Sequence, residues 1–333
     1  YYENQQALTY NNSLYAQNTP VRYSHEEINN WGKWGENDEK GAGNYITSEL
    51  IVKAAQLIKK GETFSLAIPI DNIGPMFPGN NYAPQHLMTL TGADYQSVDY
   101  TPHNGDMRYA MDAISMSLHA TTSWDALSHA WYGDSLYNGY SEKEIVSRRW
   151  GGARKLGIEN MKESFVGRGI LIDVLAYKND SIPKGYLITR ADIENTLKKQ
   201  GTQVQQGDMV LIRTGVIPSW YENTDTESRS EFHRPQTGIA RDVVLWIKES
   251  KISAIAADNM GLERQPNPHI PEIISPLHGN ILGDLGVYIG EIFYLEDLAA
   301  DCKKDGVYEF FLAAQPLNIP GATASPINPI AIK

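Results

Sequence analysis

The chain has 333 residues, 41% of them hydrophobic and 21% charged, which allows one large domain or two smaller ones and excludes a disordered or fibrous protein. Its net charge of −11 at pH 7 makes a nucleic-acid partner unexpected, because the phosphate backbone would be repelled. The single cysteine, Cys302, excludes an intrachain disulfide and a cysteine-rich zinc cluster, and no run approaches the roughly 18 apolar residues of a membrane helix.

Residues 1–23 are expected to form an N-terminal arm, because the stretch up to Pro20 is polar and rich in asparagine and glutamine. The chain starts at Tyr1, and we expect either a trimmed start or a mature end left by removal of a signal peptide. A soluble protein in the cytoplasm and an exported one therefore both fit. Residues 24–333 are expected to form a single domain, since no repeat or low-complexity linker divides them.

The rest of the chain contains both helical and strand-like patterns. The first predicted helix covers 47–61, where Leu50, Ala54 and Leu57 repeat at helical spacing, and further helices are predicted at 190–200 and 240–250. Alternating or short apolar runs predict strands at 63–69, 111–119, 166–174, 207–215, 252–257 and 307–314. Because strands and helices do not alternate strictly, the pattern predicts one α/β domain with a mixed β-sheet flanked by helices.

Three residues that suit metal binding lie close together in the sequence. His119 is expected at the end of the strand at 111–119, and Asp125 and His129 follow within eleven residues. A helical turn would place Asp125 and His129 on one face, because they are four residues apart. Imidazole and carboxylate groups are common ligands of zinc and manganese. The spacing alone also fits histidines that are only hydrogen-bonded in the core or at the surface.

A second candidate pair, His278 and Glu291, flanks a glycine-rich stretch. Together the two segments resemble the putative cyclase family, which includes bacterial kynurenine formamidases and isatin hydrolases. The family pattern is H-x-G-T-H-x-D-x-P-x-H, followed far downstream by a His and a Glu. His119, Asp125 and His129 match the pattern, and His278 and Glu291 match the downstream pair.

The resemblance covers the chain from about residue 24 to the end, and several segments resemble a cyclase-like subgroup, at 30–39, 137–140, 166–169, 256–259 and 318–333. It implies a fold of the swivelling β/β/α type. By analogy with the family, it also implies a homo-oligomer, either a dimer or a tetramer.

One departure from the pattern affects the expected metal site. Ser123 replaces the second His, while Thr121 and Leu127 replace a Gly and a Pro. A hydroxyl is a poorer zinc ligand than an imidazole, so a first metal position should be weakened. A second position, shared by Asp125, His278 and Glu291, would survive. The resemblance therefore implies a divalent ion, Zn or Mn, with one position or reduced occupancy.

The resemblance implies a hydrolase that uses metal-activated water to open an amide, formamide, cyclic amide or lactone bond in a small-molecule substrate. The ligands would be His119, Asp125, His278 and Glu291, and His129 would be the general base or acid.

Four residues are candidates for contacting the substrate: Ser123, Trp124, Trp131 and Arg213. Core packing is the alternative for the tryptophans, and a structural ion pair is the alternative for Arg213. Two other functions remain: a metal-free binding protein that kept the pocket, and a metal-independent hydrolase that uses His129 with Asp125 and perhaps Ser123 as the nucleophile.

Overall fold

The computed structural model describes residues 22–71, 73–75, 83–96, 107–147, 151–222, 235–268 and 275–333. Of the N-terminal arm expected at residues 1–23, residues 1–21 lie outside this part of the chain, so that expectation stays a prediction. No helix in the described ranges has the length and hydropathy needed to cross a bilayer.

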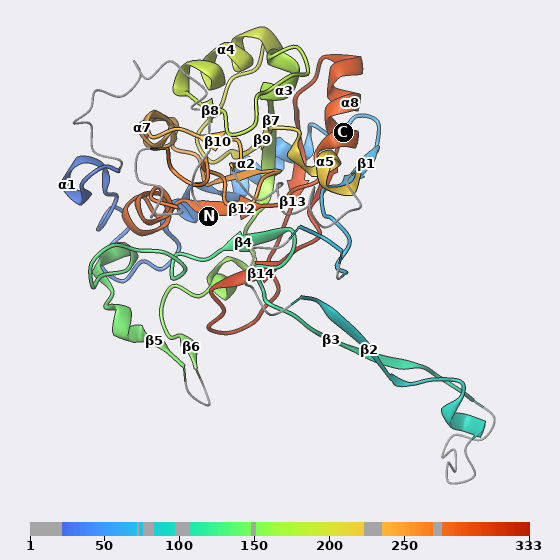
Figure 1. The fold of residues 1–333 in the computed structure, drawn as a ribbon. Helices are drawn as coiled ribbons and strands as arrows, with labels where there is room; N and C mark the ends of the chain where they lie inside the picture. Colours follow the sequence, from blue (N-terminus) through green and yellow to red (C-terminus); the bar gives the residue numbers. More distant parts are fainter. Residues whose placement is uncertain are drawn as a thin grey trace, which may run out of the picture.

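A nine-stranded sheet forms the centre of the molecule, in the order β1-β15-β13-β7-β9-β11-β12-β4-β14 (Figure 1). In that order the strands are Thr63–Ser65, Ile330–Ile332, Glu309–Ala313, Val166–Asp173, Met209–Arg213, Ala254–Ala257, Tyr288–Glu291, Ser123–Asp125 and Ala324–Pro326. The four middle strands, β7, β9, β11 and β12, are parallel, and the strands outside them pair antiparallel. The predicted mixed sheet is thus confirmed.

The middle strands are apolar because they are buried on both sides. All four residues of β11, and Met209 to Ile212 of β9, have almost no exposed surface. Helices α2, α3, α4, α7 and α8 flank this core; they cover Ser48–Ala55, Val174–Tyr177, Arg190–Gln200, Asp242–Ser250 and Glu296–Asp305. Helix α2 contacts β7 and β13, and α4 contacts β7 and α7.

Shorter elements complete the fold. Helices α1 and α5 cover His25–Ile28 and Val216–Glu222, and a π-helix covers Gly279–Asp284. Turns of 3₁₀-helix lie at Gly41–Tyr45, Asp94–Gln96, Tyr137–Gly139, Glu142–Glu144 and Ile158–Met161. Three two-stranded sheets pair β10 with β8, β2 with β3, and β5 with β6; these strands are Gly238–Ile239, Leu187–Ile188, Gln85–Leu90, Met111–Ser115, Ile145–Val146 and Gly152–Ala153.

Most of the predicted elements are present, and some have different bounds. The helix at 190–200 is confirmed, with a capping box between Thr189 and Asp192 and a left-handed cap at Gly201. The helix predicted at 47–61 ends at Ala55. The strand predicted at 111–119 ends at Ser115 and is exposed along its whole length, so its alternation does not mark a core face.

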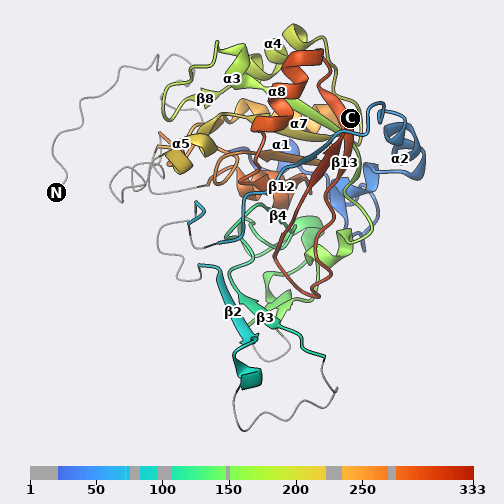
Figure 2. The same ribbon diagram turned by 90° about the vertical axis from the view of Figure 1, so that its right-hand side faces the viewer.

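That exposed strand belongs to a ribbon of two strands, β2 and β3. In both views the ribbon extends away from the body of the molecule (Figures 1 and 2). His119 therefore does not end a core strand but lies in a turn between β3 and the buried strand β4.

Candidate metal centre

The site begins with the antiparallel pairing of β4 and β12. Ser123 lies opposite Glu291, and Asp125 lies opposite Ile289. Because alternate residues of a strand share a face and directly opposed residues do too, Ser123, Asp125 and Glu291 project from the same face of the sheet. All three are buried, with 0%, 0% and 4% of their surface exposed.

His278 reaches this face from the residue preceding the π-helix Gly279–Asp284. Its Nε2 atom lies 3.2 Å from Glu291 Oε1 and 4.0 Å from Asp125 Oδ2. Asp125, His278 and Glu291 can thus each offer one ligand atom, and these atoms all lie within 4.8 Å of one another. This is the metal position expected to survive the loss of the pattern's second His.

A second group of ligand atoms adjoins the first and shares Asp125. His119 Nδ1 lies 3.0 Å from Asp125 Oδ1, and the rings of His119 and His129 are 4.3 Å apart. His119, Asp125 and His129 also place one ligand atom each within 4.8 Å. The helical turn considered for Asp125 and His129 is absent. Asp125 ends β4, and a turn closed by the His129 N–H to Ala126 brings His129 back.

The electrostatics of the site reflect buried carboxylates next to imidazoles. Burial alone would raise the pKa of Asp125, but the neighbouring His129 and His119 lower it to about 2. Burial and the charge of Asp125 raise the pKa of Glu291. Burial lowers the pKa of His129 to about 4, so its ring is neutral at pH 7. The pKa shifts of Asp125 and Glu291 are thus opposite in direction. A cation bound between the two carboxylates would stabilise the anionic form of both.

Two buried polar atoms test whether the residues fit a metal ion. Asp125 Oδ2 and Ser123 Oγ have no hydrogen-bond partner among the described residues. An unpaired carboxylate oxygen costs free energy when it is buried, and a divalent ion would satisfy it. The donor set of imidazole nitrogens and carboxylate oxygens suits zinc or manganese. The residues present therefore fit a divalent ion.

Glu263 is a member of the site that sequence reasoning missed. It accepts hydrogen bonds from the backbone N–H groups of Leu277 and His278, and from His278 Nδ1 at 2.7 Å. Although burial alone would lower the pKa of His278, its hydrogen bonds to Glu263 and Glu291 raise it to about 10. Glu263 thus fixes the ring with Nε2 towards Asp125 and Glu291. No spacing pattern links residue 263 to residue 278, so only the fold reveals this contact.

The tryptophans expected at a substrate pocket lie in different environments. Trp124 is fully buried and stacks on Phe165, and its Nε1 donates to the carbonyl of Ala314. Its place in β4 turns it away from the face that carries Ser123 and Asp125, so core packing, not substrate contact, explains it. Trp131 is half-buried, with Nε1 3.2 Å from Glu142. A role for Trp131 in substrate binding stays a prediction.

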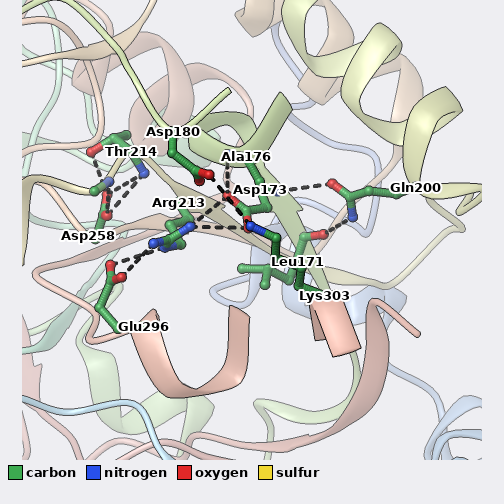
Figure 3. A network of polar contacts seen from close by, with 11 residues as sticks. Leu171, Asp173, Ala176, Asp180, Gln200, Arg213, Thr214, Asp258, Glu296 and Lys303 are labelled. Atoms are coloured by element: carbon green, nitrogen blue, oxygen red, sulfur yellow. Dashed lines mark hydrogen bonds and ion pairs between the residues drawn. The ribbon is translucent and has the colours of Figure 1, made fainter. Parts of the chain in front are cut away.

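Arg213, the last candidate for substrate binding, lies in a network of ion pairs (Figure 3). Its guanidinium donates to Asp173 at 3.0 and 3.2 Å and to both carboxylate oxygens of Glu296. Asp173 and Glu296 thus already provide carboxylate partners for all three nitrogens of the guanidinium. These contacts favour the structural ion pair, which holds the carboxyl ends of β7 and β9 to α8, and a role for Arg213 in substrate binding stays a prediction.

Comparison with known proteins points to one family. Residues 64–264 match the model of a family described as Putative cyclase. A crystal structure described as a novel cyclase is 55% identical, covers 94% of this chain and 100% of its own, and superposes with a TM-score of 0.88. No curated protein matches the chain.

Two isatin hydrolases share the fold at low identity. Isatin hydrolase A from Ralstonia solanacearum is 15% identical, with a TM-score of 0.58 and coverage of 86% of this chain and 98% of its own. Isatin hydrolase A from Labrenzia aggregata, bound to benzyl benzoate, is 20% identical, with a TM-score of 0.55 and coverage of 84% and 94%. At these identities the likeness concerns the fold alone.

We expect Arg213→Met to lower the free energy of unfolding by about 3 kcal/mol, because it leaves Asp173 buried without its cation. Arg190→Met is the matched control. Arg190 pairs with Glu194 and Glu249 near the surface, so its loss should cost at most about 1 kcal/mol. Urea denaturation at equal metal content measures both values. Equal losses in the two variants would show that the network of Arg213 adds nothing beyond a surface pair.

We expect Glu263→Gln to raise the dissociation constant for Zn²⁺ or Mn²⁺ by about 10–100-fold, because an amide cannot accept all three N–H groups that orient His278. Glu194→Gln, on the surface of α4, is the control. Competition with a chromophoric chelator gives the affinity, and circular dichroism verifies folding. A folded Glu263→Gln protein with wild-type affinity would contradict the positioning role.

Proposed function

Because the chain belongs to the putative cyclase family, we propose that it is a metal-dependent hydrolase that opens an amide, formamide, cyclic amide or lactone bond in a small molecule. The main support is the convergence of residues 119–129 with His278 and Glu291 around Asp125. The fold shared with two isatin hydrolases supports hydrolysis as the reaction class.

In this proposal Asp125, His278 and Glu291 would hold the ion, and His119 and Asp125 would contribute to the adjoining position. A bound zinc or manganese ion would supply Lewis acidity, by which the scissile carbonyl would be polarised and the pKa of water lowered. Asp125 belongs to both groups of ligand atoms, so its two oxygens face the two positions separately. Glu263 keeps His278 directed at the ion.

His129 is proposed as the general base or acid. Its ring lies 4.3 Å from that of His119 and 6.3 Å from that of His278, so it borders the candidate metal site. A neutral imidazole can accept a proton from water and return it to the leaving group. It can also serve as a metal ligand in the group with His119 and Asp125, and the test below separates the two roles.

Ser123 is proposed to contact the substrate. Its hydroxyl is buried, has no partner among the described residues and lies on the face of β4 that carries Asp125. The family pattern has a His at this position, whose imidazole would bind metal. The smaller hydroxyl of Ser123 leaves room for a substrate there and can form a hydrogen bond with it. The same observation supports one alternative, in which Ser123 is the nucleophile of a metal-independent hydrolase.

The proposal is tested with protein stripped by a chelator, then loaded with Zn²⁺ or Mn²⁺ and assayed on aryl formamides, cyclic amides and lactones. We expect no turnover in the stripped protein and recovery on loading, because the ion would supply the Lewis acidity that polarises the carbonyl and activates the attacking water. His129→Gln should lower kcat by about 10²–10⁴-fold and keep the metal content, whereas Asp125→Asn should lose the ion.

Three outcomes would contradict this assignment. Near-zero metal content after loading would favour a metal-free binding protein. Turnover that resists chelation and disappears in Ser123→Ala would favour the serine mechanism. Loss of metal in His129→Gln would make His129 a ligand and leave the general base to another group.

A further inference from the structure

The segment that carries Glu263 is held in a backbone conformation that its sequence does not favour. Gly261 has a φ of +120°, and Leu262, directly before Glu263, has a φ of +59°. A leucine in the left-handed region is energetically unfavourable, because its Cβ crowds the following carbonyl oxygen. Such a conformation persists only where the surrounding structure enforces it. The contacts that enforce it here therefore also fix the place of the Glu263 carboxylate.

The side chain of Asn259 provides the first of these contacts. It is fully buried, and its Nδ2 donates to the carbonyl of Leu262 at 3.1 Å and to that of Thr237 at 2.7 Å. The Leu262 carbonyl also accepts from the backbone N–H of Ile239 at 3.0 Å. One amide group thus joins the left-handed turn to the segment at 237–239. Because both of its partners are carbonyl oxygens, only a donor can bind them.

Asn259 is also tied to the strand that carries Glu291. Its own carbonyl accepts from the N–H of Ile292, directly after that strand, at 3.0 Å. The side chain and the main chain of this one residue therefore link the Glu263 turn to the end of β12. A variant at position 259 keeps the main-chain bond, so it alters only the link to the turn.

The second contact is the close approach of β10 to the backbone of Glu263. A Cβ atom at Gly238 would lie 2.6 Å from the backbone nitrogen of Arg264 and still nearer to the carbonyl carbon of Glu263. Neither atom belongs to a flexible side chain, so a side chain at position 238 would displace the Glu263 backbone. The carbonyl of Ile239 accepts from Arg264 N–H, so the two segments are hydrogen-bonded directly beside this contact.

A displaced Glu263 would release His278. The Glu263 carboxylate is 1% exposed and accepts from the N–H groups of Leu277 and His278 and from His278 Nδ1 at 2.7 Å. Hydrogen bonds weaken steeply once distance and angle leave their narrow range. Without the bond at Nδ1 nothing turns Nε2 of the ring towards Glu291, which lies 3.2 Å away.

We propose that Asn259 and Gly238 are positioning residues for the candidate metal centre. Both fix the backbone of Glu263, and Glu263 in turn fixes the ring of His278. The effect on metal affinity rests on the proposed metal-dependent function. The orientation of His278 in the metal-free protein does not, so the two can fail separately.

The first measurement is the dissociation constant for Zn²⁺, by competition with a chromophoric chelator, in Gly238→Ala and in Asn259→Ser, whose hydroxyl can donate to only one of the two carbonyls. We expect both to raise it by about 10-fold or more, as losses behind a metal ligand do. Combined with Glu263→Gln, neither should change the constant of that variant by more than about twofold, because both act through Glu263.

Two controls make the same chemical changes elsewhere. Gly167→Ala adds a methyl group to the buried strand β7, where the nearest atom lies 3.8 Å away. Asn44→Ser removes an amide that donates to Asp38 and Gly41. Both should keep the wild-type dissociation constant, and circular dichroism verifies folding in every variant.

The second measurement is the imidazole N–H signal of His278 in metal-free protein labelled with ¹⁵N-histidine, assigned by its absence in His278→Gln. A short bond to a buried carboxylate should give a downfield, slowly exchanging Nδ1 proton in the wild type and both controls. Gly238→Ala and Asn259→Ser should lose that protection.

Three results would overturn the proposal: an unchanged Nδ1 signal in both folded variants, wild-type affinity in both, or a loss of affinity that multiplies with that of Glu263→Gln. A wild-type protein that binds no Zn²⁺ would refute the proposed function instead. The Nδ1 signal would then still decide whether Asn259 and Gly238 position His278.

Discussion

The pairing of β4 with β12 is the contact on which the candidate centre depends. Strand β4 has only three residues, so its place in the sheet relies on tertiary contacts: Trp124 packs against Phe165 and Phe293 on one face. The Thr122 hydroxyl donates to the carbonyl of Ile292 and accepts from Ile68, which ties the strand to the end of β12. The opposite face is thereby left to Ser123 and Asp125. The packing of Trp124 on the apolar face of β4 therefore fixes the positions of Ser123 and Asp125 on the opposite face.

That placement has an energetic cost, because it buries acidic groups together. Asp125, Glu263 and Glu291 each have less than 5% of their surface exposed. His278 lies among all three and is hydrogen-bonded to Glu263 and Glu291. In the absence of an ion, protonated His278 offsets part of this repulsion. A cation bound among these carboxylates would relieve the same repulsion, so the cost of burying them and the proposed affinity for metal would have the same origin.

The sequence predicted those parts whose signals are local. The helix at 190–200 is marked by Thr189 and Gly201 at its ends, and the parallel strands β7, β9 and β11 appear as apolar runs. Residues whose roles depend on distant contacts were not predictable in this way. Glu263 has no motif, Trp124 and Trp131 look alike in the sequence, and β4 is too short for a period to emerge. The alternation in β3 suggested a core face, whereas the strand is exposed throughout.

The position of His119 in the candidate metal centre depends on the segment that joins strand β3 of the ribbon to strand β4. His119 lies in a turn between β3 and β4, its side chain is 25% exposed, and it contacts the centre through Asp125 at 3.0 Å and the ring of His129 at 4.3 Å. A ligand on such a segment is held well only if both ends of the segment are fixed. The buried strand β4 fixes the end at Ser123. At the other end the strands β2 and β3 are exposed apart from Leu90, so the contacts of His119 with Asp125 and His129 are what hold this turn to the centre.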